Sequence, residues 1–552
     1  MKTSVLVITI SLLIAAFFRV VLPWNNTFVD NEVRFSQVDS YYSIEAVDMM
    51  RENTLNISNR SPYLLSEYIV FGLSCIISFG DPPSKNTTDT IAALFTALCG
   101  LLAILLIYFV TRELFNNEKI ALLSIALAAL MPGEFLSRTS LGFFDHHALE
   151  IVLFLASVLF FIRCIKNNKN YPIFNLIMSG LFASMYMFNW IGGILLPGIY
   201  ILFTVAYIVF FIYRGKIFPI IISILPVIMI CLTTFVLFHA NLSEKATETI
   251  AIETQSTIAS SLFSIESFAF LNNIIPMIMS RIVWDISTII SEGQPLLFSS
   301  GKFTLLLVWI NFGILFPIFL FGLGIMLRQK ITTARLFFLC WSIIILVLTL
   351  GGVRFAEYLA VNVAIISSFT IVYVYQRIKA PAKRLKRLIL YTVFAGIIIV
   401  VPLVSYSSLI AKQSPEYFTD SWHDAMVWID KNTDQDAIIL SLWDYGYWIK
   451  REGNRKPFCD PGRPNNREIT ASLLLNSPEQ SAIDMQVLDI GYIIIDSLMV
   501  KEKYYVYETQ ANFNNPIENS TVSCLYYATD TTGFEQVFIS PEVVIYKIYE
   551  VK

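Results

Sequence analysis

Long apolar segments follow one another along the first part of the chain, up to about residue 407. Each runs for roughly 20 residues, the length that an α-helix needs to cross the hydrocarbon core of a bilayer. The composition agrees, because 56% of the 552 residues are hydrophobic and only 15% are charged, whereas about a quarter of the residues of a soluble domain are charged. The sequence therefore predicts a polytopic α-helical membrane protein.

Eleven of these segments are distinct enough to be placed. The interval 239–302 holds further apolar sequence, with room for two more helices, and an even number there leaves the topology unchanged. The predicted spans cover residues 4–22, 91–110, 120–137, 148–162, 172–189, 191–213, 217–238, 303–326, 333–350, 355–375 and 388–407.

The basic residues indicate which loops face the cytoplasm, because cytoplasmic loops are enriched in Lys and Arg. With the N-terminus inside, five inner loops are basic, whereas the short outer loops carry almost only Arg138 and Arg354. The sequence thus predicts a multi-pass protein of the cell membrane with a cytoplasmic N-terminus. Residues 23–90, 138–147 and 239–302 would form outer loops. A net charge of −3 without a basic stripe argues against a nucleic-acid partner.

The residues from 410 to 552 form the only long soluble stretch, which would lie outside the cell. Apolar and aromatic runs at 437–442, 491–495 and 543–549 predict strands, and 422–430 predicts a helix. We therefore expect residues 1–409 to form a transmembrane domain and residues 410–552 an extracytoplasmic globular domain of mixed α/β structure. Two of the seven cysteines, Cys459 and Cys524, lie in this tail, and their spacing leaves a disulfide between them open.

One outer loop ends in Asp145-His146-His147, just before a membrane span. A carboxylate and an imidazole at i and i+2 suit Mn²⁺, Fe²⁺ or Zn²⁺ better than Ca²⁺. Two ligands are too few for a metal site, so further ligands would have to come from distant loops. The alternative is that Asp145 caps the following helix and that both histidines are exposed.

Three further outer residues are chemically suggestive but weak by themselves. Asp39 is a lone acid beside aromatic residues, and Glu292 lies in a loop that contains Gly and Pro; both would be ordinary solvated residues. Arg354 lies at the outer end of a span and is suited to bidentate binding of phosphate. It could equally extend to the interface or pair with Glu357 at i+3.

In the tail, residues 442–446 read Leu-Trp-Asp-Tyr-Gly. Trp443 and Tyr445 could be plain core aromatics, but the carboxylate of Asp444 between them needs polar partners if it is buried. The alternative is a small recognition site with rigid aromatic walls, in which the carboxylate accepts a hydrogen bond from a hydroxyl group.

In their order and topology, these motifs resemble the catalytic subunits of oligosaccharyltransferases over essentially the whole chain, most closely the archaeal dolichyl-phosphooligosaccharide–protein glycosyltransferases. Residues 442–446 resemble the Trp-Trp-Asp-Tyr-Gly signature, with Leu442 in place of the first Trp. Asp145-His146-His147 resembles the second acidic motif in its Asp-x-His form. Residues 289–292 resemble Thr-Ile-x-Glu, with Ile289 in the Thr position.

The resemblance implies a membrane fold of the GT-C type with thirteen helices, and an outer globular domain. It implies an inverting, metal-dependent transfer of an oligosaccharide from a dolichyl-phosphate-type carrier to the Asn amide of Asn-X-Ser/Thr. Met499 would complete the pocket for the hydroxyl residue. The implied roles are catalysis by Asp39 and Glu292; Mn²⁺ or Mg²⁺ binding by Asp39, Asp145, His147 and Glu292; lipid-phosphate binding by Arg354; and acceptor binding by Trp443, Asp444, Tyr445 and Met499.

The expected partners are the lipid-linked oligosaccharide, acceptor proteins and membrane lipid, with the chain working as a single subunit. Two other functions compete with this interpretation. A protein O-mannosyltransferase would share the outer-loop acids but would not need the Trp-Asp-Tyr-Gly segment. A transporter of lipid-linked sugars would place charged or broken helices near the bilayer midplane, whereas here the acids lie at the outer ends of largely uncharged spans.

Overall fold

The computed structural model describes residues 2–53, 65–166, 172–211, 295–299, 302–377, 418–460, 466–501 and 516–549, with a few positions between 392 and 407. The chain divides into two compact units. The first, the membrane unit, contains residues 1–33 and 46–414, and the second, the C-terminal unit, contains residues 34–45 and 415–552. The predicted spans at 217–238 and, for the most part, at 388–407 lie outside the described residues, as does nearly all of 239–302.

Within the described ranges, five helices are long and apolar enough to cross a membrane. They cover Thr3–Thr27, Lys85–Phe115, His147–Ile165, Thr333–Gly351 and Val353–Arg377, and they correspond to five predicted spans. A polytopic helical membrane fold is therefore confirmed. The helices of this unit up to residue 211 are α1 (Lys2–Ala16), η1 (Phe17–Val21), α2 (Trp24–Thr27), α3 (Val38–Arg51), α4 (Leu65–Ile77), α5 (Lys85–Phe115), α6 (Glu118–Ala129), α7 (Glu134–Ser137), α8 (His147–Ile165), α9 (Pro172–Asn189), η3 (Ile191–Ile194) and α10 (Leu195–Phe211).

Two predicted spans are interrupted. The span predicted at 120–137 is broken between α6 and α7, and Gly133, which directly precedes α7, has a φ of +67°. The span predicted at 303–326 is bent by 83° between α15 (Leu306–Phe312) and α16 (Leu315–Leu327). Gly313, with a φ of +53°, lies at that break. An α-helix cannot continue through a residue with a positive φ, which glycine adopts at little cost.

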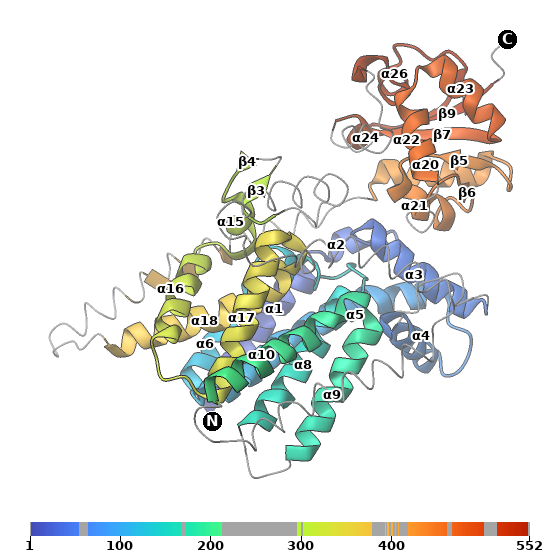
Figure 1. Cartoon of the computed structure of the whole chain (residues 1–552). Helices are drawn as coiled ribbons and strands as arrows, with labels where there is room; N and C mark the ends of the chain where they lie inside the picture. The colour runs from blue at the N-terminus through green and yellow to red at the C-terminus, as the bar shows by residue number, and fades with distance from the viewer. Residues whose placement is uncertain are drawn as a thin grey trace. The chain divides into compact units, whose positions relative to one another are not determined.

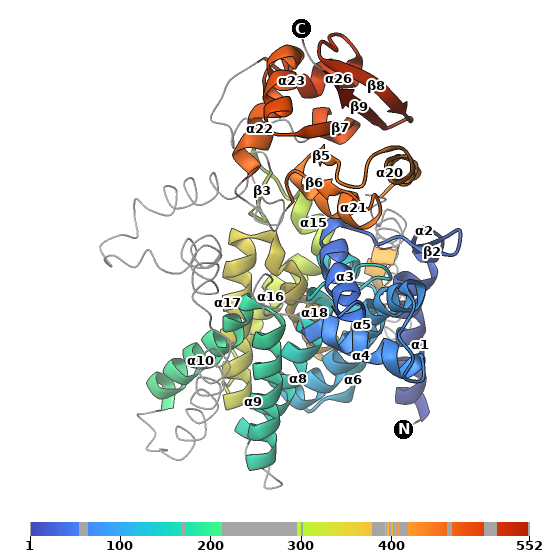
Figure 2. The same ribbon diagram turned by 90° about the vertical axis from the view of Figure 1, so that its right-hand side faces the viewer.

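The later part of the membrane unit continues with α17 (Thr333–Gly351), η7 (Val353–Phe355) and α18 (Ala356–Arg377). Helix α8 packs against both α5 and α9, and α18 packs against α6, α16 and α17 (Figure 2). Two short hairpins join β1 (Phe28–Val29) to β2 (Glu32–Val33) and β3 (Phe298–Ser299) to β4 (Lys302–Phe303). The first turns of α8 and α18 and the segments just before them carry the ionisable residues considered below.

The C-terminal unit contains a five-stranded mixed sheet in the order β6-β5-β7-β9-β8, flanked by short helices (Figure 1). Strands β5, β6 and β7 are parallel to one another, whereas β9 runs antiparallel to β7 and β8. This arrangement confirms the predicted α/β domain and its three strands. The elements are α20 (Asp420–Asn432), β5 (Ile438–Leu440), η8 (Trp443–Tyr445), α21 (Gly446–Arg451), β6 (Lys456–Pro457), α22 (Arg467–Leu475), α23 (Pro478–Val487), β7 (Ile490–Asp496), α24 (Ser497–Lys501), η10 (Ile517–Asn519), α26 (Thr521–Tyr527), β8 (Phe534–Ile539) and β9 (Val543–Ile548).

A segment of the first predicted outer loop, residues 34–45, also belongs to the C-terminal unit. Within residues 34–45, the buried ring of Tyr41 packs 5.6 Å from Phe418 and 6.2 Å from Trp448. Glu45 forms an ion pair with Lys450 of α21. The domain boundary predicted at residue 410 did not anticipate that residues 34–45 belong to this unit. Their placement depends on aromatic contacts between segments about 400 residues apart in the chain.

Candidate functional site

The loop that leads into α8 is held by backbone hydrogen bonds to two other helices. The amide of Leu141 donates to the carbonyl of Arg19 at 2.8 Å, and the amide of Gly142 donates to the carbonyl of Ala93 at 3.2 Å. Gly142 has a φ of +82°, which a residue without a Cβ adopts at little cost. These hydrogen bonds therefore fix the loop that places Asp145 directly before the N-cap of α8.

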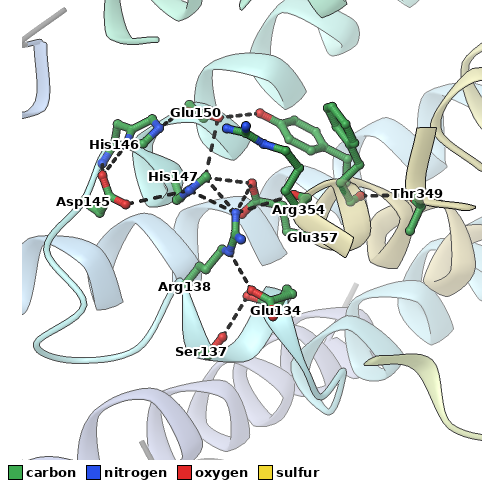
Figure 3. Close-up of polar contacts among 12 residues, drawn as sticks. Glu134, Ser137, Arg138, Asp145, His146, His147, Glu150, Thr349, Arg354 and Glu357 are labelled. Carbon is green, nitrogen blue, oxygen red and sulfur yellow. Dashed lines mark hydrogen bonds and ion pairs between the residues drawn. The ribbon is translucent and has the colours of Figure 1, made fainter. Parts of the chain in front are cut away.

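Asp145, His146 and His147 form a compact group at this point (Figure 3). The two imidazole rings stack with centroids 4.3 Å apart, and Nε2 of His147 lies 3.7 Å from Oδ2 of Asp145. Burial favours a neutral His146, but the carboxylates of Asp145 and Glu150 outweigh it and raise the pKa of His146 to about 10. Burial likewise opposes ionisation of Asp145, and the neighbouring histidines, His146 foremost, nevertheless hold its pKa below the usual range.

Two buried glutamates complete the group from within the helices. Glu150, on α8, lies 3.2 Å from Nε2 of His146 and accepts a 2.7 Å hydrogen bond from the hydroxyl of Tyr358. Glu357, on α18, lies 3.1 Å from Nδ1 of His147. Neither side chain is more than 1% exposed. The first turn of α18 thus contributes to both histidine–carboxylate pairs. Glu357 pairs with His147, and Tyr358 donates to Glu150, the partner of His146.

Arg138 supplies a buried positive charge to the same group (Figure 3). Its Nε donates to Glu134 at 2.7 Å, and its Nη1 lies 3.5 Å from Glu357 and 3.0 Å from both ring nitrogens of His147. The side chain is fully buried. A buried charge is tolerated only when it is paired and hydrogen-bonded, and these carboxylates meet that requirement.

Arg354 lies on η7, one turn before Glu357. Its guanidinium stacks over the ring of Trp190 with 5.2 Å from Cζ to the ring centroid. The ring of His146 also lies against Trp190, with 6.1 Å between the ring centroids, so Arg354 and His146 contact the same aromatic side chain. An arginine stacked on an aromatic face keeps its planar donor fork available for a phosphate or carboxylate. Arg354 is therefore a candidate anion-binding residue beside the Asp145–His147 group.

The donor atoms of the group fit a divalent metal. Asp145, His146 and His147 place ligand atoms within 4.8 Å of one another, and so do His147, Glu150 and Glu357. Both glutamates of the second set are buried, and Glu150 is shared between the two sets, because its Oε1 lies 3.2 Å from Nε2 of His146. Mixed imidazole and carboxylate ligands suit first-row divalent ions such as Zn²⁺ or Mn²⁺.

In the C-terminal unit, residues 442–446 follow β5 directly. Trp443 and Tyr445 are buried, whereas Asp444 between them is partly exposed. Gly446 is needed for packing, because a Cβ there would lie 2.6 Å from the carbonyl oxygen of Cys459. The guanidinium of Arg467 lies 5.8 Å from the ring of Trp443. The motif thus combines rigid aromatic packing with one accessible carboxylate.

The parallel pairing of β5 and β7 brings a second predicted segment to the same edge of the sheet. Asp496, at the end of β7, accepts hydrogen bonds from the amide of Met499 at 2.8 Å and from Nε1 of Trp422 at 3.1 Å. Tyr445 also donates a side-chain hydrogen bond to Asp496. Burial raises the pKa of Asp496, although these hydrogen bonds oppose the shift. The 442–446 motif and Met499 are therefore linked through one buried carboxylate.

The structure brings some predicted site residues together and leaves others unplaced. Asp145 and His147 are adjacent, and Asp145 does not cap α8, whose N-cap is His146. His147 is buried, so the alternative of exposed histidines is wrong for it. Asp39 lies in the first turn of α3, within the C-terminal unit. Glu292 lies outside the described residues.

The sequence interpretation missed Glu150 and did not foresee the partners of Glu357. An ionisable residue inside an apolar span is a signal of function, and both residues carry that signal. Their partners, however, lie more than 200 residues away along the chain. In the tail, Cys459 and Cys524 are both free and buried, so the structure contains no disulfide between them.

The chain matches two known protein families. Residues 9–411 match the family described as "Oligosaccharyl transferase STT3, N-terminal", and residues 435–530 match the "STT3/PglB/AglB core domain". One relative is dolichyl-phosphooligosaccharide-protein glycotransferase 3 of Archaeoglobus fulgidus, which is 23% identical over 96% of this chain and 73% of its own length.

Two solved structures from the same organism share the fold. An oligosaccharyltransferase tethered to an acceptor peptide with the NVT sequon has a TM-score of 0.71 at 19% identity, over 99% of this chain and 74% of that one. The same enzyme in complex with Zn and sulfate has a TM-score of 0.65 at 18% identity, over 98% and 72%. Because the first family match covers most of the chain, this membrane protein belongs to the STT3 family of oligosaccharyltransferases, which are glycosyltransferases.

Proposed function

We propose that this chain transfers an oligosaccharide from a dolichyl-phosphate-type lipid to the side-chain amide of Asn in Asn-X-Ser/Thr sequons. The observation that carries the proposal is the buried Asp145–His147 group, with Arg354 stacked on the same Trp190 ring that His146 contacts. A carboxylate–imidazole set next to a guanidinium can bind a phosphorylated donor. Neither an O-mannosyltransferase nor a transporter accounts for the Trp-Asp-Tyr-Gly segment, and we set both aside.

The reaction forms a bond between the Asn nitrogen and the anomeric carbon and breaks the bond from that carbon to the lipid phosphate. The amide is a weak nucleophile, because conjugation that gives a rotation barrier of about 18–20 kcal/mol ties up its lone pair. We assign to Asp39 and Glu292 the task of accepting hydrogen bonds from the amide N–H groups, which disturbs this conjugation. Attack from the face opposite the phosphate inverts the anomeric configuration.

Asp145 and His147 would hold a divalent ion, with Asp39 and Glu292 as the further ligands that the family resemblance implies. A bound Mn²⁺ or Mg²⁺ would supply Lewis acidity toward the phosphate and a template for its orientation. Arg354 binds the same phosphate and neutralises charge as the lipid departs. An oligosaccharyltransferase of the same fold has been solved in complex with Zn and sulfate, which supports a divalent cation in this proposal.

The sequon would be recognised in the C-terminal unit. Asp444 is half-buried within an otherwise buried aromatic motif, and we assign to its carboxylate the task of accepting a hydrogen bond from the Ser or Thr hydroxyl. Trp443 and Tyr445 form rigid walls, and Met499 supplies an apolar contact for the Thr methyl group. A site that binds a hydroxyl through a buried hydrogen bond rejects analogues that lack it.

The chain would act as a single subunit in the cell membrane, with the N-terminus in the cytoplasm and the C-terminal unit outside. The basic inner loops support that orientation. An outer location places the sequon-binding motif where translocated acceptor proteins emerge, and the lipid carrier presents its glycan on the same side.

The proposal is tested with purified full-length protein, native glycolipid extract and a fluorescent Asn-X-Thr peptide. Glycan transfer is expected in Mn²⁺ or Mg²⁺ and is expected to be lost in EDTA or with a Gln-X-Thr peptide. Asp444→Ala should raise the KM for the peptide, whereas Asp145→Ala should mainly lower kcat. Asp424→Ala, at an exposed acid of the C-terminal unit, is the matched control.

Equal effects of Asp444→Ala and Asp145→Ala on KM and kcat would contradict this division of roles. Absence of transfer by folded protein with a demonstrated glycolipid donor would refute the proposed function itself. Transfer of sugar to Ser or Thr in the peptide, with none to Asn, would point to the O-glycosyltransferase.

A further inference from the structure

The first two turns of α3 contact α21 at matching positions within the C-terminal unit. The rings of Tyr42 and Tyr447 lie 5.2 Å apart between their centroids. Further along both helices, Glu45 forms an ion pair with Lys450. In each helix the second contact lies three residues after the first, which is about one helical turn. The two helices therefore run in the same direction here, and their register is fixed at two successive turns.

The same register, followed one turn back, leads to two carboxylates. Asp39 lies three residues before Tyr42, in the first turn of α3. Asp444 lies three residues before Tyr447, in η8, which continues directly into α21. Asp39 is exposed and Asp444 is half-buried. The helix pair thus carries, at the same end, the residue assigned to the Asn amide and the residue assigned to the hydroxyl.

An aromatic core holds α21 in place. The fully buried indole of Trp448 stacks on the ring of Tyr445 with 4.7 Å between the centroids, and it lies 5.3 Å from Phe418. Tyr41 of α3 enters the same core, 6.2 Å from Trp448. Because buried side chains are close-packed, such a core resists a shift of either helix. Packing and the ion pair therefore set the spacing of α3 and α21 together.

The spacing of a packed helix pair suits a sequon in an extended chain. The axes of packed helices lie about 8–10 Å apart, and two residues of extended chain span about 7 Å. Side chains at i and i+2 of an extended strand project to the same face, whereas those at i+1 and i+3 project to the opposite face. An extended Asn-X-Ser/Thr therefore presents its amide and its hydroxyl on one side, at nearly the spacing of two packed helices.

We propose that α3 and α21 measure the one-residue spacing of the sequon, with Glu45 and Lys450 as positioning residues that hold Asp39 level with Asp444. This inference rests on the proposed function, because it uses the roles assigned there to Asp39 and Asp444. The hydroxyl residue binds at Asp444, and the amide then reaches Asp39 only when one residue separates the two. Glu45 and Lys450 do not touch the acceptor and act through the register of the helices.

The test is glycan transfer by the full-length protein, with native glycolipid extract, to fluorescent Asn-X-Thr and Asn-X-X-Thr peptides. Lys450→Glu sets two negative charges against each other and should lower kcat for Asn-X-Thr about 10- to 100-fold, the scale expected when a reacting group is displaced by about 1 Å. The KM should stay close to that of wild type, because Trp443 and Asp444 are unchanged. The preference for Asn-X-Thr over Asn-X-X-Thr should fall. Lys431→Glu, the same charge change at an exposed position of α20, should behave as wild type.

A charge swap separates positioning from loss of structure. Glu45→Lys combined with Lys450→Glu restores an ion pair of reversed polarity and should recover most of kcat. A swap that is no more active than Lys450→Glu alone would overturn the inference. So would a lowered melting temperature with an unchanged kcat of the folded protein, which indicates a purely structural contact. A raised KM at constant kcat would also overturn it, because the contact would then support only the hydroxyl pocket.

The remaining outcomes are also decisive. If Lys450→Glu fails to fold, Lys450→Met, which keeps an aliphatic stem, is measured in its place, and a wild-type kcat in it refutes the proposal. Transfer by wild type with an equal kcat in Lys450→Glu removes this inference and leaves the proposed function standing. Absence of transfer by folded wild-type protein with a demonstrated glycolipid donor removes the proposed function, and this inference falls with it.

Discussion

The carboxylate of Asp496 connects residues 442–446 to the rest of the C-terminal unit, so its removal should lower the stability of that unit. It is 2% exposed and accepts from the amide of Met499, the indole of Trp422 and the side chain of Tyr445. Asp496→Ala leaves these three donors buried without their acceptor. At about 1 kcal/mol net for each hydrogen bond, the variant should lose about 3 kcal/mol of stability.

A loss of this size is readily detected. In a domain of this length, 1 kcal/mol corresponds to a shift of roughly 2–4 °C in melting temperature, so Asp496→Ala should lower it by about 6–12 °C. The assay is thermal unfolding of the full chain followed by tryptophan fluorescence, since Trp422 and Trp448 lie in the same core. Asp436→Ala, at an exposed acid of the same unit, should remain within about 0.5 kcal/mol of wild type.

The raised pKa of Asp496 adds a dependence on pH whose sign is fixed. Because burial raises the folded-state pKa above the unfolded value, the contribution of this carboxyl to stability is complete below the unfolded pKa and is lost as the pH rises through the folded pKa. The neutral Asp496→Asn variant lacks this dependence. The melting temperature of wild type minus that of Asp496→Asn should therefore decrease from acidic to neutral pH.

Two results would refute this reasoning. One is an Asp496→Ala variant that melts with wild type, which would show that water replaces the lost acceptor at no cost. The other is a difference between wild type and Asp496→Asn that grows as the pH rises, which would mean that folding lowers the pKa.

Three other measurements check separate parts of the structure. Gly446→Ala should lower the melting temperature and weaken binding of an acceptor peptide, because the added Cβ would overlap the carbonyl of Cys459. Gly491→Ala should be tolerated, because the nearest atom to the added Cβ lies 3.9 Å away. Equal melting temperatures of the two variants would contradict the packing argument. Arg19→Met removes the 2.9 Å hydrogen bond to Thr139 and should destabilise the membrane unit by about 1–3 kcal/mol in thermal unfolding. A melting temperature equal to that of wild type would argue against a role of Arg19 in holding the loop that leads into α8. Dialysis against EDTA should abolish transfer and added Mn²⁺ should restore it, while activity that survives exhaustive chelation would exclude a metal requirement.

The sequence was most informative where structure follows from local pattern. The apolar runs predicted the helices α5, α8, α17 and α18, and the alternating runs of the tail predicted β5, β7 and β9. Short-range geometry was less predictable. The breaks at Gly133 and Gly313 depend on positive φ angles inside segments whose hydropathy is continuous.

The candidate site was only half predictable for a different reason. Asp145 and His147 are neighbours in sequence, so their spacing could be interpreted directly. Glu150 and Glu357 matter through partners on other helices, and a single sequence does not contain that pairing. The placement of Asp39 in the C-terminal unit likewise follows from packing of Tyr41 on Trp448, which no local pattern encodes.

The separation of α8 from α18 along the chain has a consequence for biogenesis. His147 is synthesised 210 residues before Glu357, and Glu150 is synthesised 208 residues before Tyr358. At about 5–20 residues per second, α8 waits roughly 10–40 s for those partners. During that interval, a helix with ionisable groups in its first turn must enter the bilayer with only its local partners, His146 and Arg138, and without Glu357 and Tyr358. Nascent chains that end before residue 356 should therefore be poorly inserted and should be substrates for membrane quality control.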